Sequence, residues 1–381
     1  MSACSYEQWA LLPNISLKFN LLCCMSSIHE TLNSIPRLPL ASYPTPLEHL
    51  PRLSKELGRE IYIKRDDGIG PAMGGNKTRK LEYLLADAQR RGAKKIVTFG
   101  GLQSNHARLT AAACAALGLE SHLFYFAKKP AKYEGNLLFN DLIGSRMHFI
   151  PFGGNNTQNL TLETTIRLVK IIATLRIGAH YFIPVGGHNW LGCLGYVRAA
   201  LEIDEQARAM QIENAKIILA IGTGGTLAGL LAGLTLIDSP LKLLGIDIGK
   251  LWKGFPKSIA HLANEIYDHL RGDDPIVPLY FFAPGHLRDV PTERLYRFMP
   301  DDVPMIENRY AGRGYAMPND STMNAIRKLA SLEGIILDPI YTGKAFAGML
   351  DMIARDEIAK DEPIIFLHTG GLPGLFAFEN Y

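Results

Sequence analysis

The feature that most constrains the fold of this chain is a repeated order of short apolar run, glycine-rich loop and helical pattern. The run 95–99 precedes GGLQSNH and an alanine-rich helical stretch over 107–117, and the run 216–221 precedes GTGGT and a helix to about 237. A helix that joins two parallel strands in this way forms a βαβ unit. The order therefore predicts an α/β fold with open, twisted, mainly parallel sheets flanked by helices.

The rest of the chain continues the pattern. Residues 60–67 alternate like a strand, and a helical stretch over 76–91 follows a glycine turn. Prolines at close spacing between Pro36 and Pro51 predict an extended lead-in instead of a helix. Further strands are expected at 121–126, 242–248 and 363–367, and the region 150–190 is expected to cross between two lobes around one helix.

Length and composition exclude several classes of protein. The 381 residues allow two domains, and 40 basic against 37 acidic residues give a net charge of +3, so no affinity for nucleic acid is indicated. Every apolar run is far shorter than the roughly 20 residues that cross a bilayer. The five cysteines lack zinc-binding spacings and favour a reducing compartment, which predicts a cytoplasmic protein without a metal site.

The first 35 residues differ from the rest. They contain Lys18 as their only lysine or arginine, and their apolar stretch is interrupted, so they are a poor signal or transit peptide. We expect residues 1–35 to be a dispensable or disordered extension, with Met25 as a candidate initiator.

Three glycine-rich loops are candidates for a ligand site, because parallel sheets bind ligands at the carboxyl ends of their strands. In GLQSNH, Ser104 and Asn105 can cap a helix or bind a small carboxylate. The GTGGT loop can cradle a phosphate or form a simple tight turn. A dinucleotide-binding fingerprint would need a third glycine at position 227, where this chain has Leu227. Asp247 lies at a plausible distance along the chain for a ribose contact, so a nicotinamide-dependent enzyme remains an alternative.

The loop GGNKTRK places Lys77 and Lys80 at the start of a helix. Cations there oppose the helix dipole, and an anion nearby or a neutral lysine relieves this conflict. A solvated lysine remains the simpler interpretation of this segment by itself.

Taken together and in order, the motifs of the chain resemble one family. The ordered motifs are GGNKTRK, GGLQSNH, PVGGHNWLGCLGY, GTGGT, GYAMPND, DPIYTGKAFAG and HTGG. They resemble the pyridoxal-phosphate enzymes of the D-cysteine desulfhydrase and 1-aminocyclopropane-1-carboxylate deaminase family, from about residue 37 to 378. The resemblance implies the fold type II architecture of the tryptophan synthase β group, with a small domain at 81–186 inserted into a large one at 36–80 and 187–381. It also implies a homodimer.

The resemblance implies a role for each matching residue. Lys77 would bind pyridoxal 5'-phosphate covalently and later move the α-proton of an amino-acid substrate. Ser104 would take the substrate carboxylate, Asn105 the phenolic oxygen of the cofactor, and the phenols of Tyr315 and Tyr341 would act in catalysis. The phosphate would be held by Lys80, Gly222, Thr223, Gly224, Gly225 and Thr226.

Three positions distinguish the two branches of the family. The deaminase pattern has glutamate, leucine and glutamine where this chain has Thr342, Thr369 and His106. A threonine, expected to be Thr369, is a weaker partner of the pyridine nitrogen than a carboxylate and suits elimination of a good leaving group. His106 would assist that group, shape the substrate pocket or simply start a helix.

The sequence therefore predicts a lyase that converts D-cysteine to pyruvate, hydrogen sulfide and ammonia. The alternatives are the cyclopropane deaminase, a lyase for another β-substituted alanine, and a nicotinamide-dependent oxidoreductase.

Overall fold

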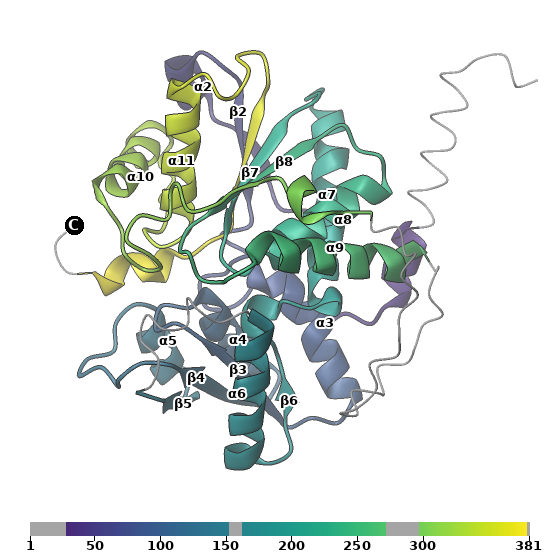
Figure 1. Ribbon diagram of the computed structural model, residues 1–381, viewed down its shortest axis with the longest axis vertical. Coiled ribbons are helices and arrows are strands. Elements are labelled where there is room, and N and C mark those ends of the chain that lie inside the picture. The colour runs from purple at the N-terminus through teal and green to yellow at the C-terminus, as the bar shows by residue number, and fades with distance from the viewer. Residues whose placement is uncertain (1–27, 152–161, 272–296, 379–381) are drawn as a thin grey trace, which may run out of the picture.

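The chain folds into two lobes, each built on a sheet (Figure 1). The computed structural model describes residues 28–151, 162–271 and 297–378. In this part of the chain, no helix is long and apolar enough to cross a membrane. The FGGNN segment and most of the predicted N-terminal extension lie outside the described residues.

The larger lobe contains a six-stranded sheet. Its strands lie in the order β1 (Leu47–His49), β2 (Ile61–Arg65), β10 (Ile364–His368), β7 (Lys216–Ile221), β8 (Lys242–Asp247), β9 (Met305–Ile306). Only β1 runs antiparallel to its neighbour. The predicted strands at 60–67, 216–221, 242–248 and 363–367 are all found here, which confirms the mainly parallel α/β fold.

Helices cover both faces of this sheet. Successive side chains of a strand point to opposite faces, so Ile217 and Leu219 enter one apolar core and Ile218 and Ala220 enter the other. The first core is covered by α3 (Lys77–Arg90), α7 (Trp190–Ala209), α8 (Gly225–Leu236) and α9 (Phe255–Arg271). The second is covered by α2 (Pro51–Leu57), α10 (Asp320–Glu333) and α11 (Thr342–Ala354).

The smaller lobe has a four-stranded, fully parallel sheet. The order is β5 (Arg146–Phe149), β4 (Glu120–Tyr125), β3 (Lys95–Gly100), β6 (Tyr181–Phe182), with helices α4 (Asn105–Ala116), α5 (Asn136–Leu142) and α6 (Leu162–Ile177). All four strands fall within 81–186 and all strands of the large sheet fall outside it. The domain boundaries remain a prediction that this distribution supports.

The end of the predicted N-terminal extension is folded. Residues 28–34 are helical, and the side chains of Ile28 and Leu32 are buried in the first core of the large lobe. The last residues of the predicted extension are therefore part of the folded large lobe, because Ile28 and Leu32 lie on one side of a helix and pack against the core of that lobe.

Candidate active site

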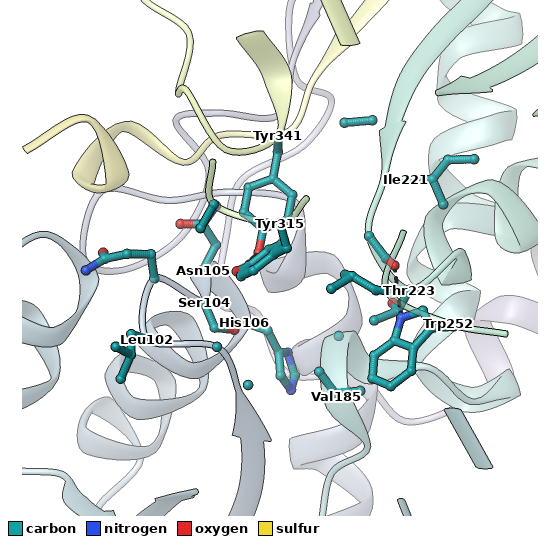
Figure 2. A pocket seen from close by; sticks show the side chains of 18 of the residues that line it. Leu102, Ser104, Asn105, His106, Val185, Ile221, Thr223, Trp252, Tyr315 and Tyr341 are labelled. Atoms are coloured by element: carbon teal, nitrogen blue, oxygen red, sulfur yellow. Dashed lines mark hydrogen bonds between the residues drawn. The ribbon is translucent and has the colours of Figure 1, made fainter. Parts of the chain in front are cut away.

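A cavity of about 540 Å³ lies where the carboxyl ends of strands from both sheets meet. Its walls include the start of α3 and the loops that follow β3, β7, β8 and β10. Figure 2 shows Ser104, Asn105 and His106 on one side and Tyr315 and Tyr341 on another, with Thr223 and Trp252 beside them. The three glycine loops that the sequence singled out thus converge on one site.

Most of the predicted site residues line this cavity. They are Lys77, Ser104, Asn105, His106, Gly222, Thr223, Gly224, Thr226, Tyr315, Tyr341 and Thr369. Lys80, Gly225 and Thr342 are not among the lining residues, and their positions are described below. No lining residue in the described part of the chain is acidic, so the cavity favours anionic groups.

Lys77 is the first residue of α3 and is held in place by its neighbours. The amide of Asn76 donates to the Thr369 carbonyl at 3.1 Å, and its side-chain amide donates to the Thr226 hydroxyl at 3.2 Å. These bonds join the start of α3 to the loops after β10 and β7. Burial lowers the pKa of Lys77 well below its ordinary value, and the nearby Lys80 cation lowers it further. A lowered pKa favours the neutral amine, which is the state that attacks a carbonyl carbon, and Lys77 lines the cavity.

Lys80 lies one helical turn beyond Lys77, behind the loop 222–226. It is fully buried, and among the described residues the Cys193 thiol, at 3.9 Å, is the one hydrogen-bond partner of its ammonium. A Cβ atom added to Gly225 would lie 2.7 Å from the Lys80 ammonium and 3.4 Å from Nδ1 of His188. A side chain at position 225 would therefore require the Lys80 ammonium to move.

The loop 222–226 has the chemistry of a phosphate cradle. Gly224 has a left-handed backbone (φ +82°), and α8 begins at Gly225, so the first amides of the helix are directed toward the cavity. Thr223 and Thr226 add hydroxyl donors. Burial lowers the pKa of Lys80, which has no carboxylate partner in the described part of the chain, so an anion beside it would stabilise its charged form. These residues therefore fit a phosphate group.

Ser104 caps α4 and lines the cavity at the same time. Its hydroxyl oxygen accepts from the amide of Ala107 at 3.2 Å, and the hydroxyl hydrogen is left to donate. Asn105 is oriented by Asn136, whose side-chain amide donates to Oδ1 of Asn105 at 3.1 Å. Since its oxygen is engaged, Asn105 presents the NH₂ group, which suits an oxyanion.

The hydrogen bonds of His106 define its tautomer. The Thr98 hydroxyl has one hydrogen, which it donates to the Ile183 carbonyl at 2.8 Å. Nε2 of His106, 2.9 Å from the same hydroxyl oxygen, must therefore carry a hydrogen and donate it. The Nδ1 atom is left as a buried acceptor that has no hydrogen-bond partner among the residues the structure describes. Burial, with Lys77 and Lys80 nearby, lowers the pKa of His106 well below its ordinary value, so the ring is neutral.

Tyr315 and Tyr341 form a close pair, and the ring of Tyr315 reaches the loop that carries Ser104 (Figure 2). Their hydroxyl oxygens are 2.5 Å apart, and the rings meet edge to face with centroids 5.6 Å apart. Burial raises the pKa of both phenols, so both stay protonated at neutral pH. One of the two hydroxyl hydrogens forms the hydrogen bond between the phenols, and the other can be donated to a ligand.

The two candidate threonines have different surroundings. The Thr342 hydroxyl donates to Asp338 at 2.7 Å and accepts from the amide of Asp338, away from the cavity wall. The Asp338 carboxylate also accepts from the amide of Tyr341 at 2.8 Å, so it fixes the start of α11. Thr369 lines the cavity.

One residue of the site that the sequence did not predict is Trp252. Trp252 lines the cavity, and its indole donates to the Gly222 carbonyl at 3.2 Å, which braces the phosphate loop. Nothing in its sequence context signals this contact. Asp247, the acidic residue of the nicotinamide alternative, accepts from the amides of Gly249, Lys250 and Asn308 and does not line the cavity.

Comparison with known proteins agrees with this geometry. A family model described as "Pyridoxal-phosphate dependent enzyme" matches residues 38–370. The chain is 40% identical to a D-cysteine desulfhydrase of Salmonella newport (strain SL254) over 358 residues, which are 92% of this chain and 98% of that protein. It is 41% identical to the D-cysteine desulfhydrase of Salmonella choleraesuis (strain SC-B67) over the same shares.

Solved structures give the same result. A crystal structure described as that of an ACC deaminase homologue superposes with a TM-score of 0.75 at 34% identity, covering 92% of this chain and 96% of that one. A fungal L-serine ammonia-lyase from Rhizomucor miehei, 19% identical with a TM-score of 0.56, shares the fold.

The fold and the cavity are those of a fold type II enzyme that uses pyridoxal phosphate. This chain belongs to the pyridoxal-phosphate-dependent enzyme family, as its motifs predicted.

Proposed function

We propose that this enzyme is a D-cysteine desulfhydrase, which converts D-cysteine and water to pyruvate, hydrogen sulfide and ammonia. The observation that carries the proposal is the meeting of Lys77, the 222–226 loop and the tyrosine pair in one cavity that has no acidic lining residue. The 40% identity to D-cysteine desulfhydrases over nearly the whole of both chains supports the choice of substrate.

In this proposal the residues of the cradle hold the phosphate of the cofactor. The Lys80 ammonium and the amides and hydroxyls of the 222–226 loop would bind it, and Asn105 would donate to the phenolic oxygen. Lys77 would carry the cofactor on its Nζ atom. When bound, pyridoxal phosphate supplies an electron sink for the negative charge that forms on the α-carbon of the substrate.

The chain would then orient the substrate and move its protons. The Ser104 hydroxyl and the first amides of α4 would bind the carboxylate, because a helix N-terminus favours an anion. Lys77, released as a neutral amine, would take the α-proton. A phenol of the pair formed by Tyr315 and Tyr341 would donate to the departing sulfur.

Thr369 is the threonine that supports the desulfhydrase branch. It lines the cavity, whereas Thr342 is engaged by Asp338. A neutral hydroxyl near the ring nitrogen of the cofactor makes a weaker electron sink than a carboxylate does, and it suffices when the thiolate leaves readily.

A second candidate is 1-aminocyclopropane-1-carboxylate deaminase. The likeness to the structure described as an ACC deaminase homologue favours it. That reaction would release 2-oxobutanoate.

The experiment is an absorbance spectrum of the purified protein with pyridoxal phosphate, followed by separate additions of D-cysteine, L-cysteine and 1-aminocyclopropane-1-carboxylate. We expect a visible band of lysine-bound cofactor, with sulfide and pyruvate from D-cysteine alone. Release of 2-oxobutanoate from the cyclopropane substrate would transfer the assignment to the deaminase. Sulfide from neither cysteine would refute the proposal. The proposed homodimer and cytoplasmic location are supported by the family resemblance, and light scattering tests the first.

A further inference from the structure

Lys344, which lies in α11 behind the tyrosine pair, has unusual surroundings for a buried lysine. It is 1% exposed, and among the described residues no carboxylate forms a salt bridge with it, although Asp247 and Asp338 are close enough to act on its charge. Its ammonium instead donates to three backbone carbonyls: Ile248 at 3.0 Å, Ala311 at 2.9 Å and Gly314 at 2.6 Å. An ammonium has three hydrogens, so each one is used.

Two of these carbonyls belong to the segment that carries Tyr315. Gly314, directly before it, has φ +137°, and Ala316, directly after it, has φ +55°. Alanine seldom adopts a positive φ, so the backbone conformation at Ala316 persists only when the surrounding structure restrains it. The contacts of Lys344 are such a restraint.

The ring of Tyr315 has little freedom to move without a loss of contact. It meets Tyr341, the residue directly before α11, and a Cβ atom added to Gly101 would lie 2.7 Å from its Cε1 atom. Gly101 belongs to the loop after β3, in the smaller lobe. Tyr315 therefore spans from the large lobe to the loop that carries Ser104, and a small shift of its backbone would separate it from both.

We propose that Lys344 is a positioning residue that holds Tyr315 in its catalytic geometry. Its ammonium joins the end of β8 to the backbone on the N-terminal side of Tyr315 and ties both to α11, the helix that begins next to Tyr341. One side chain thereby sets the distance between the two phenols. The kinetic test of this role rests on the proposed function, and the spectroscopic test does not.

The kinetic test is a double-mutant cycle with K344M, Y315F and the double variant. Methionine preserves most of the volume and removes the three donors. We expect K344M to lower the rate of sulfide release from D-cysteine about 10- to 100-fold, the loss that a displaced catalytic group causes. If Lys344 acts through Tyr315, the same substitution in the Y315F background should change the rate less than about threefold. If the double variant shows the product of the rate losses of K344M and Y315F, the two residues act independently and the proposal is wrong.

Lys64 provides a matched control. It is equally buried, but its ammonium binds Glu202, Gln206 and the Thr45 carbonyl, all away from Tyr315. K64M removes a buried lysine with a comparable risk to folding, and its effect should multiply with that of Y315F. The same non-additivity for K64M would show that loss of a buried lysine, and not the position of Tyr315, causes the effect.

The spectroscopic test places 3-fluorotyrosine at position 315 and records its ¹⁹F spectrum without substrate. We expect K344M to shift or broaden the signal and K64M to leave it unchanged, whatever the substrate of the enzyme. An unchanged signal in K344M would refute the positioning role. If the wild type releases no sulfide from D-cysteine, the proposed function fails and this test still decides on Lys344.

K344A gives a further test if K344M does not fold. The smaller side chain leaves space beside the three carbonyls, so added ethylammonium should restore the ¹⁹F signal toward that of the wild type. Tetramethylammonium has the same charge and no N–H donor, and it should restore nothing. Equal recovery with both ions would contradict a role through hydrogen bonds to the carbonyls.

Discussion

The sharpest test of the scaffold beneath the active site is the substitution D66N. Asp66 follows β2 and is fully buried, and its carboxylate accepts from Nε and Nη2 of Arg79, each at 2.8 Å. It also accepts from Tyr196 at 2.6 Å and from Thr45 at 2.9 Å. Arg79 lies in α3, two residues beyond Lys77.

The expected loss follows from the charges of the cluster. Lys64 and Arg79 are balanced by Asp66 and Glu202, and the ammonium of Lys64 is 2.5 Å from Glu202. Asparagine removes one negative charge and directs an NH₂ group at a donor of Arg79. Breaking a buried ion pair from one side costs about 3–5 kcal/mol. We expect D66N to lower the free energy of unfolding of the apoprotein by that amount.

The assay is urea unfolding of the apoprotein followed by circular dichroism, with D351N as the matched control. Asp351 pairs with Arg355 and Arg309 at the surface, and we expect little effect there. If D66N is no more destabilising than D351N, the buried cluster does not stabilise the start of α3 and the reasoning fails.

The pH dependence of stability gives the same cluster a second test. Burial alone would raise the pKa of Asp66, but Arg79, Tyr196 and Lys64 outweigh it, and the pKa lies below its ordinary value. The stabilisation is therefore present above the unfolded pKa of about 3.9 and is lost as the pH falls through the folded value. D66N should lose less stability than the wild type on acidification, and an equal loss would contradict this assignment.

The other predictions concern the cavity. K77A should abolish both the visible band and turnover, and substantial turnover by K77A would contradict the role of Lys77. H106N keeps an acceptor in the place of Nδ1, and H106Q keeps the donor to Thr98. If Nδ1 of His106 acts as an acceptor, H106N should retain more activity on D-cysteine than H106Q, and the reverse order would contradict that role. G225A should displace the Lys80 ammonium and weaken cofactor affinity about 10- to 100-fold in a spectroscopic titration. Unchanged affinity would place the phosphate elsewhere.

The sequence predicts those parts of the site that depend on local order. Glycine loops after apolar runs indicate the carboxyl ends of strands. The pattern therefore predicts that Ser104, Gly222 and Thr369 each lie at the carboxyl end of a parallel strand, where ligands bind. The two sheets and the lining positions of these loops were predicted in this way. Their shared cavity followed only from the family resemblance, because local pattern does not place one sheet against another.

The contacts that hold the loops in place could not be predicted. Trp252, Asp338 and Lys344 bind backbone groups that are remote in the chain or belong to a turn without a regular pattern. A side chain that binds a carbonyl leaves no periodic signal, and a lysine at a helical position normally indicates solvent exposure. The positions of these three residues depend on the assembled fold.

The segment KTRK shows how one helix serves both the scaffold and the chemistry. Residues three apart lie on one side of a helix, so Lys77 and Lys80 both face the phosphate loop and the cavity wall. Arg79 points away from them and enters the cluster with Asp66 and Glu202. A carboxylate on the Lys77 side would raise the pKa of that lysine and oppose its reaction.

The acidic groups of this cluster, Asp66 and Glu202, are instead on the Arg79 side, where they anchor the helix. Burial, the dipole of α3 and the Lys80 cation therefore act on Lys77 in one direction, toward the neutral amine. An anion bound at Lys80 would shield part of that cation, so the pKa of Lys77 should rise when a phosphate fills the cradle.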